Sequence, residues 1–168
     1  MDRNAFWKMI EDAKSECDGD PYEQAELLQS ALADGSPEDI LAFDRHFSEL
    51  HAASYGWPLW GAAYLINGGC SDDSFDYFRA WLIGQGQAVF EKALADPDSL
   101  AELEDLEEDA TDGEDILAAA YDAYQSATGE DLPITKRAYP ELGEDWDFDD
   151  DDEMKSRYPK LFAKFCAD

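Results

Sequence analysis

Basic residues are scarce in this sequence. Twelve lysines and arginines stand against 41 aspartates and glutamates, so the 168-residue chain carries a formal net charge of −29 at pH 7. A surface this acidic repels the phosphate groups of nucleic acids and of anionic lipids. We therefore expect no direct binding to nucleic acid and no binding to membranes.

Cysteines and metal-binding patterns are also rare. Cys17, Cys70 and Cys166 are an odd number and form no CxxC pair, which disfavours a disulfide framework and a zinc site. His46 and His51 are five residues apart, so they diverge by about 140° around a helix, whereas a HExxH zinc site needs a separation of four. The sequence assigns no metal ligand, no cofactor and no catalytic residue.

Long apolar runs are absent. The most apolar stretch, residues 57–66, has ten residues and fits a buried helix, since a membrane-spanning helix needs about 20. The N-terminus also lacks the basic and apolar segments of a signal peptide. These features predict a soluble, cytoplasmic protein.

Apolar and aromatic residues, in contrast, are plentiful. Hydrophobic residues make up 45% of the chain and aromatic residues 13%, which argues against disorder. A chain of this mass buries about 70% of its unfolded surface when it folds as one unit. We expect a single domain in which residues 1–132 form a helical part, and residues 133–168 form an acidic loop and a short C-terminal helix that docks on it.

Helical periodicity recurs along the first 127 residues. The apolar residues Phe6, Ile10, Ala13 and Cys17 fall on one face of a helix. Similar stripes, together with helix-start signals such as Ser36-Pro37, predict further helices. These cover residues 22–33, 37–55, 58–66, 72–94 with a kink at Gly84 to Gly86, 100–106 and 114–127. Because runs of alternating β-branched residues are missing, the predicted fold class is all-α, a bundle of about six to eight helices with an irregular acidic segment near the C-terminus.

A long motif in the centre of the chain is similar to a known bacterial family. The motif reads LWGAAYLINGGCSDDSFDYFRAWLI over residues 59–83 and continues with ADPDSL at residues 95–100. It resembles the DUF4240 domain, a domain of unknown function. The resemblance spans about residues 4–127, with a weaker echo at residues 158–162, and leaves out the acidic stretch 144–153. It implies a small, mostly helical, cytosolic protein and supplies no established catalytic residues.

The densest polar cluster lies within this motif. Asp72, Asp76 and Arg79 have the spacing i, i+4 and i+7, so they share one helix face. Together with Asp73 and Trp60 they form a candidate ligand-binding cleft, in which the arginine binds an anion and the aspartates bind a cation or transfer protons. The alternative is structural: acids in the first turn complement the helix dipole, and Arg79 pairs with Asp76 inside the core.

Acidic residues concentrate in two segments. Residues 102–115 hold nine acids and residues 144–153 hold eight. The second segment begins like a calcium-binding EF-hand loop, but Asp150 and Ser156 occupy the positions that require glycine and glutamate. The candidate partner-binding residues in the two segments are Glu104, Asp105, Glu107, Glu108, Asp149, Asp150, Asp151 and Asp152.

Two functions are compatible with these features. The first is a non-catalytic interaction protein whose acidic face binds a basic protein, as an immunity protein binds a toxin or a nucleic-acid mimic fills a basic groove. The alternative is a small-ligand-binding or enzymatic domain that uses the cleft around Trp60, Asp72, Asp76 and Arg79. No spacing in the chain specifies a reaction.

Overall fold

The protein is all-α, as the sequence predicts. The computed structural model describes residues 1–134 and 136–166, which form nine α-helices and one 3₁₀ helix and contain no strand. The helices are α1 (Arg3–Glu16), α2 (Pro21–Ala33), α3 (Pro37–Ala53), α4 (Trp57–Asn67), α5 (Asp72–Gly84), α6 (Gln87–Ala95), η1 (Pro97–Glu102), α7 (Glu114–Thr128), α8 (Asp151–Arg157) and α9 (Pro159–Phe165).

Local capping signals explain where the helices begin and end. Ser36 and Asp39 form a complete capping box at the start of α3, and the Ser71 hydroxyl accepts a hydrogen bond from the Ser74 amide at the start of α5. Gly68 ends α4 in a left-handed conformation with φ of 64°, which a glycine adopts without a steric penalty. The sequence therefore fixes the turn between α4 and α5.

Four expectations about the helices need correction. The stretch 84–86 separates α5 from α6 completely, because Gly86 has φ of 99°. The segment expected at 100–106 is a 3₁₀ helix over Pro97–Glu102. The C-terminal pattern forms two short helices, since Pro159 lacks the amide hydrogen that would continue α8. Finally, the irregular acidic segment stops at Asp150, so Asp151 and Asp152 belong to α8.

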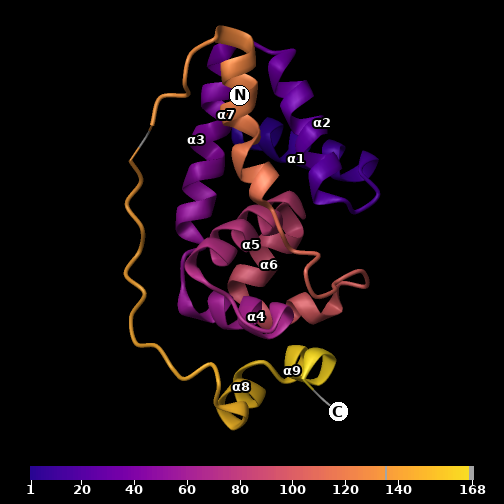
Figure 1. The fold of residues 1–168 in the computed structure, drawn as a ribbon, viewed down its shortest axis with the longest axis vertical. Helices are drawn as coiled ribbons and strands as arrows, with labels where there is room; N and C mark the ends of the chain where they lie inside the picture. Colours follow the sequence, from indigo (N-terminus) through magenta and orange to yellow (C-terminus); the bar gives the residue numbers. More distant parts are fainter. Residues whose placement is uncertain (135, 167–168) are drawn as a thin grey trace.

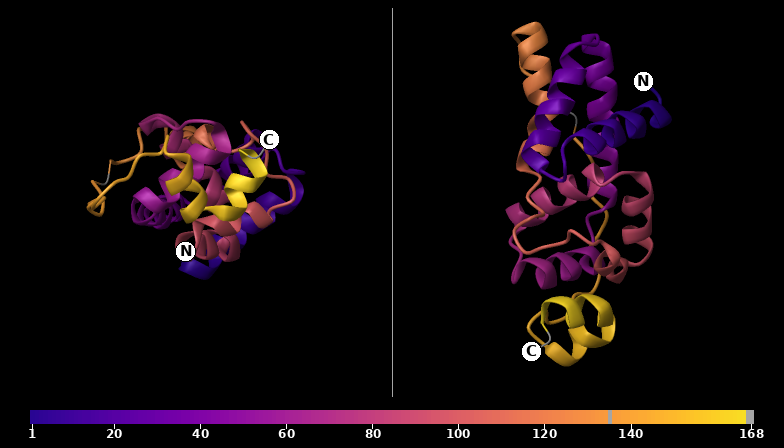
Figure 2. Two further views of the ribbon diagram at one scale, coloured as in Figure 1. Left: turned by 90° about the horizontal axis from the view of Figure 1, so that it is seen from below. Right: turned by 90° about the vertical axis from the view of Figure 1, so that its right-hand side faces the viewer.

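The helices pack as two groups (Figure 1). Helices α2, α3 and α7 lie side by side along the long axis, with α1 crossing them, and α4, α5 and α6 form the other end. Helices α8 and α9 lie beyond α4 (Figure 2), where α9 contacts α4 and η1 and α8 contacts α9. An extended segment connects the far end of α7 with α8 and passes beside α3. We call this segment, residues 130–134 and 136–150, the strap.

The core joins both groups of helices. The aromatic and leucine side chains that flank the turn between α4 and α5 are buried, namely Trp60, Phe75, Phe78, Trp81 and Leu82. Tyr64 is half-buried, because its ring packs on Phe148 and its hydroxyl donates a hydrogen bond to Asp149. The central hairpin of α4 and α5 is thus the middle of the core. No helix in the described part of the chain is both long and apolar enough to cross a membrane.

The C-terminal helices are fastened to the body by specific contacts. Tyr158 is buried, and its hydroxyl donates a 2.7 Å hydrogen bond to the carbonyl of Pro58. This approach requires Gly61, because a Cβ at that position would lie 2.4 Å from the Tyr158 hydroxyl. The buried Asp98 carboxylate accepts hydrogen bonds from the backbone amides of Lys160 and Leu161, so η1 caps the start of α9.

Candidate functional site

Arg79 lies inside the core, where it joins α5 to the end of α3. Only 1% of its side chain is exposed. Its Nε donates a 3.3 Å hydrogen bond to the carbonyl of Phe75, and its terminal nitrogens donate to the carbonyl of His51 and to the carboxylate of Asp76. The guanidinium also lies 5.1 Å from the ring centre of Tyr55. These contacts give the arginine the core-pairing role that the sequence offered as the structural alternative.

His51 completes this buried network as a neutral ring. Its Nε2 lies 3.0 Å from the carbonyl of Asp76, and its Nδ1 lies 3.4 Å from Nη1 of Arg79. Because the carbonyl can only accept and the guanidinium can only donate, Nε2 carries the hydrogen. Burial, together with the positive charge of Arg79, lowers the pKa of His51 to about 4. The ring therefore remains uncharged at neutral pH.

The structure brings three of the five predicted cleft residues together. Asp72, Asp76 and Arg79 line a cleft of about 380 Å³ with Tyr55 and with Tyr139 of the strap. We call this the arginine cleft. Aspartate and tyrosine form its open part, since the arginine is almost completely covered. A ligand in this cleft would meet carboxylates and aromatic rings before it met the guanidinium.

The other two predicted residues lie outside the cleft. Trp60 is buried one layer deeper, where it packs on Phe75 and donates a 2.9 Å hydrogen bond to the carbonyl of Cys70. Asp73 projects from the next face of α5, and its charge contributes to raising the pKa of Tyr77, after that of Glu114. The helical period explains this result, because adjacent residues on a helix diverge by about 100°.

A second hollow lies beside the arginine cleft, beneath the strap. It has a volume of about 500 Å³ and shares Asp76 and Tyr139 with the arginine cleft. We call it the strap cleft. Its remaining lining residues are Asp44, Phe47, Ser48, His51, Leu117, Lys136 and Arg137. Sequence reasoning missed these residues, although Lys136 and Arg137 are the only adjacent basic residues in the chain and so gave a weak signal.

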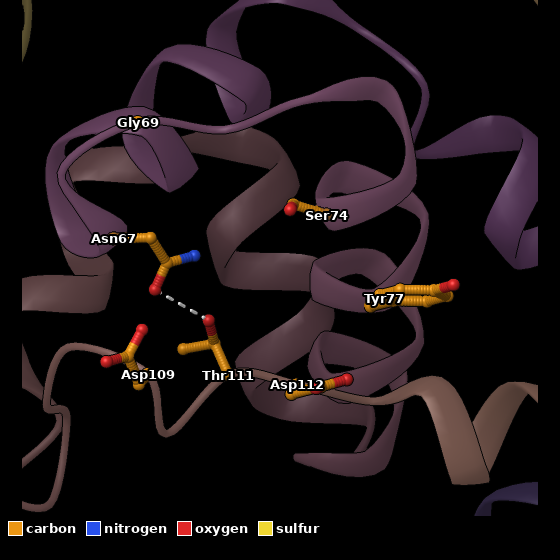
Figure 3. Close-up of a pocket in the computed structure, with 7 residues that line it drawn as sticks. All are labelled: Asn67, Gly69, Ser74, Tyr77, Asp109, Thr111 and Asp112. Carbon is orange, nitrogen blue, oxygen red and sulfur yellow. Dashed lines mark hydrogen bonds between the residues drawn. The ribbon is translucent and has the colours of Figure 1, made fainter.

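A smaller polar pocket of about 240 Å³ lies between the α4–α5 turn and the first acidic segment. Figure 3 shows Asn67, Asp109 and Thr111 on one side of this loop pocket, and Tyr77 and Asp112 on the other. The Thr111 hydroxyl donates a 3.0 Å hydrogen bond to the Asn67 side chain, which ties the acidic segment to α4.

Gly113 anchors the first acidic segment to α5. The amide of Gly113 donates a 3.1 Å hydrogen bond to the carbonyl of Tyr77, and a Cβ on Gly113 would lie 2.3 Å from the amide nitrogen of Trp81. The loop 103–113 is therefore held against the α4–α5 hairpin at two points.

All eight predicted partner-binding residues are exposed. Glu104, Asp105, Glu107 and Glu108 lie on the loop 103–113, where the buried side chains of Leu106 and Thr111 anchor the backbone. The other four lie at the start of α8, namely Asp149, Asp150, Asp151 and Asp152. Two of these four also have structural contacts, since Asp149 accepts from Tyr64 and Asp150 caps α8.

One residue of each acidic segment lies near the C-terminal half of α4. Asp149 contacts Tyr64 on α4, and one helical turn later the Glu108 carboxylate lies 3.4 Å from where a Cβ on Gly68 would be. Among the described residues, the ion pairs of these segments involve only Glu102, with Lys92 and Lys160, and Glu153, with Arg157. We call the eight partner-binding residues together the acidic face.

The arrangement offers little to metals or to thiol chemistry. Within residues 1–134 and 136–166, no group of three or more His, Cys, Asp or Glu side chains is placed to hold a metal ion. The three cysteines are unpaired. Burial raises the pKa of Cys70 to about 12, so its thiol stays protonated and is a poor nucleophile.

The comparisons with known proteins identify a family. The model described as "Protein of unknown function (DUF4240)" matches residues 1–126, which include the α4–α5 hairpin, the loop 103–113 and most of α7. The match ends before the strap and before α8 and α9. No curated protein and no solved structure matches the chain.

Proposed function

The chain belongs to the DUF4240 family, and we propose that it is a non-catalytic interaction protein that binds a basic protein partner through its acidic face. The approach of Glu108 and Asp149, one residue from each acidic segment, to α4 carries this proposal. Apart from Glu102 and Glu153, the carboxylates of these segments have no basic side chain as an ion-pair partner among the described residues. A partner with complementary charge would neutralise them.

The way in which the loop 103–113 is held supports this role. Its acidic side chains point to solvent while Leu106, Thr111 and Gly113 fix the backbone on the helices beneath. A surface that is ordered before binding loses less conformational entropy when the partner docks. Complementary charge also steers the encounter and raises the association rate at low salt.

The loop pocket offers a place for a basic side chain within this surface. Asp109 and Asp112 line the pocket, and the ring of Tyr77 forms part of its wall. Carboxylates bind a guanidinium through paired hydrogen bonds, and an aromatic ring attracts a cation. A lysine or arginine of the partner would therefore fit here. The partner could be a toxin that the protein neutralises in the cytoplasm, or a protein with a basic nucleic-acid-binding groove.

The test combines a binding assay with matched variants. The immobilised protein is exposed to lysate of its host across a salt series, and retained proteins are identified. The loop variant carries Glu104→Gln, Asp105→Asn, Glu107→Gln and Glu108→Gln. The control variant removes four exposed acids on or next to α2, α3 and α7 through Asp34→Asn, Glu38→Gln, Asp122→Asn and Glu130→Gln.

We expect a basic protein that binds at low salt, is released at high salt, binds the control variant normally and binds the loop variant at least tenfold more weakly. If both variants bound the basic protein equally weakly, binding would depend on the net charge of the whole protein. This result would contradict a defined acidic face. Retention of no basic protein by the unsubstituted chain would overturn the proposal.

The second candidate function, a small-ligand-binding cleft, also has a specific observation in its favour. The strap brings Tyr139 to both clefts, and it brings Lys136 and Arg137 to the strap cleft beside α3 and α5. The positive charges of Lys136 and Arg137 would make such a site prefer anionic ligands.

A further inference from the structure

The strap cleft gathers positive charge in an otherwise acidic protein. Lys136 and Arg137 line it directly, and the backbone carbonyl of Arg45 on α3 accepts a hydrogen bond from Arg137. Only twelve basic residues exist in the whole chain. Two adjacent ones at the mouth of a hollow of about 500 Å³ therefore distinguish this cleft from every acidic surface described above.

The carboxylates in and beside the cleft cancel only part of this charge. Asp76 is paired with Arg79. Burial raises the pKa of Asp44, while the positive charge of Arg137 and a hydrogen bond from Ser48 oppose this shift, so Asp44 offsets part of the charge of Arg137. Glu49 lies 3.7 Å from Arg137 but also pairs with Arg3 at 3.4 Å, so one carboxylate serves two arginines. Lys136 has no ion pair within the described residues.

One donor of Arg137 has no acceptor. The Nε of Arg137 is buried, and no hydrogen-bond partner reaches it among the described residues. A buried N–H without a partner costs about 1–3 kcal/mol, and such groups are normally satisfied by protein, water or a ligand. Because Nε has almost no exposed surface, an acceptor in the cleft would reach this donor only after the Arg137 side chain rotated.

The rest of the lining is apolar or aromatic. Phe47 of α3 and Leu117 of α7 form the walls with the ring of Tyr139, and Ser48 adds a hydroxyl. A volume near 500 Å³ is within the range of about 300–1,000 Å³ that small-molecule sites occupy, and such sites combine apolar walls with a few charged groups.

From this lining we propose that the strap cleft binds a small organic anion, with its phosphate or carboxylate group on Lys136 and Arg137 and an aromatic or apolar body against Phe47, Leu117 and Tyr139. The lining of this site comes from α3, α5, α7 and the strap, and none of the eight residues of the acidic face belongs to it. It is therefore independent of the proposed binding of a basic protein.

Phenyl phosphate is a suitable probe, because it has both an anionic group and an aromatic body. The full chain is titrated in 0.15 M NaCl and followed by backbone amide NMR signals. We expect saturable binding with a Kd below about 1 mM, with the largest shifts around Phe47 and Ser48. Benzoate tests whether a carboxylate replaces the phosphate, and inorganic phosphate, which has no body, binds at least tenfold more weakly.

Charge-removing variants distinguish binding at the strap cleft from a general effect of net charge on anion binding. Lys136→Gln removes a side chain without described contacts, so the fold is unaffected and the Kd rises about threefold. Arg137→Gln raises it about tenfold or more, because a charge-assisted hydrogen bond is lost. The double variant Lys8→Gln, Lys155→Gln changes the net charge as much as Lys136→Gln, Arg137→Gln, but at distant positions.

The proposal is overturned by any of three results. The first is the absence of saturable shifts at residues of the strap cleft up to about 10 mM of both organic anions. The second is equal weakening in the two double variants. The third is an unchanged Kd in Lys136→Gln and Arg137→Gln. None of these results bears on whether the acidic face binds a basic protein.

Discussion

Asp76 and Arg79 form an ion pair, but their side chains differ greatly in solvent exposure. The arginine side chain is 1% exposed and the aspartate side chain 44%. Asp76→Ala leaves a buried guanidinium without its counter-charge, which costs about 3 kcal/mol of unfolding free energy. Arg79→Met leaves an aspartate that water can solvate, and the carbonyl of His51 still accepts a hydrogen bond from Ser54. We expect this second substitution to cost at most about 1.5 kcal/mol.

Urea unfolding of the two variants and of the unsubstituted chain checks this order. The slope of free energy against urea should be the same in all three, because the surface exposed on unfolding is nearly unchanged. If Arg79→Met proved the more damaging substitution, the guanidinium would be stabilised mainly by carbonyls and rings, and Asp76 would be dispensable.

His51 makes the stability depend on pH in a defined window. Its pKa is about 4 in the folded protein and about 6.5 in the unfolded chain, so between these values the unfolded chain binds the additional proton. Stability from this group is present above pH 6.5 and is lost as the pH falls toward 4, by at most about 1.4 kcal/mol per pH unit.

The comparison with His51→Gln isolates this effect, because a glutamine side chain can still donate to Asp76 and accept from Arg79. We expect the difference in unfolding free energy between the two proteins to shrink from pH 7 to pH 4.5, measured by chemical denaturation. A difference that stays constant over this range would show that the ring is accessible to protons in the fold.

The sequence could predict part of the arginine cleft but, of the strap cleft, only the shared Asp76. Asp72, Asp76 and Arg79 follow from the period of one helix, which places residues i, i+4 and i+7 on one face. Tyr139 and Arg137 reach the same place through an extended segment whose path depends on contacts 92 residues apart, such as that between Arg137 and Arg45. Periodicity holds no information about such contacts.

Helix caps also divide into those that local sequence predicts and those that depend on contacts between distant residues. The caps of α3 and α5 are local serines, and they could be read from the chain. Helix α9 begins at Pro159 and has no side-chain cap from its own N-cap residue, Tyr158. Its cap comes from Asp98 instead, 62 and 63 residues away from the amides that it accepts. A cap of this kind becomes visible only in the structure.

Asp98 should therefore control the docking of α9. Asp98→Ala removes a buried acceptor from two amides, and we expect it to cost about 2 kcal/mol and to speed amide hydrogen exchange in α9. Asp98→Asn keeps one acceptor oxygen in place, so we expect its loss of unfolding free energy to be about half that of Asp98→Ala. Equal exchange of α9 in all three proteins would mean that Tyr158 and Leu161, rather than the cap, hold the helix.

On the scale of the whole molecule, charge repulsion opposes the fold. Few of the 41 acids take part in ion pairs among the described residues, namely Asp12, Asp39, Glu49, Asp76, Glu102 and Glu153. Most of the basic residues are already used in these pairs, so the remaining carboxylates repel one another across the surface. The acidic face concentrates this repulsion where the loop 103–113 and α8 approach α4.

Salt should therefore stabilise this protein. The Debye length falls from about 10 Å at 0.1 M to about 3 Å at 1 M, which screens the repulsion between carboxylates more than it weakens the buried Arg79–Asp76 pair. We expect the Tm to rise by at least about 2–4 °C between 0.05 M and 0.5 M NaCl, equivalent to about 1 kcal/mol for a chain of this size. The loop variant with Glu104→Gln, Asp105→Asn, Glu107→Gln and Glu108→Gln should have a higher Tm at low salt and a smaller rise. A Tm that falls with added NaCl would show that surface ion pairs outweigh the repulsion.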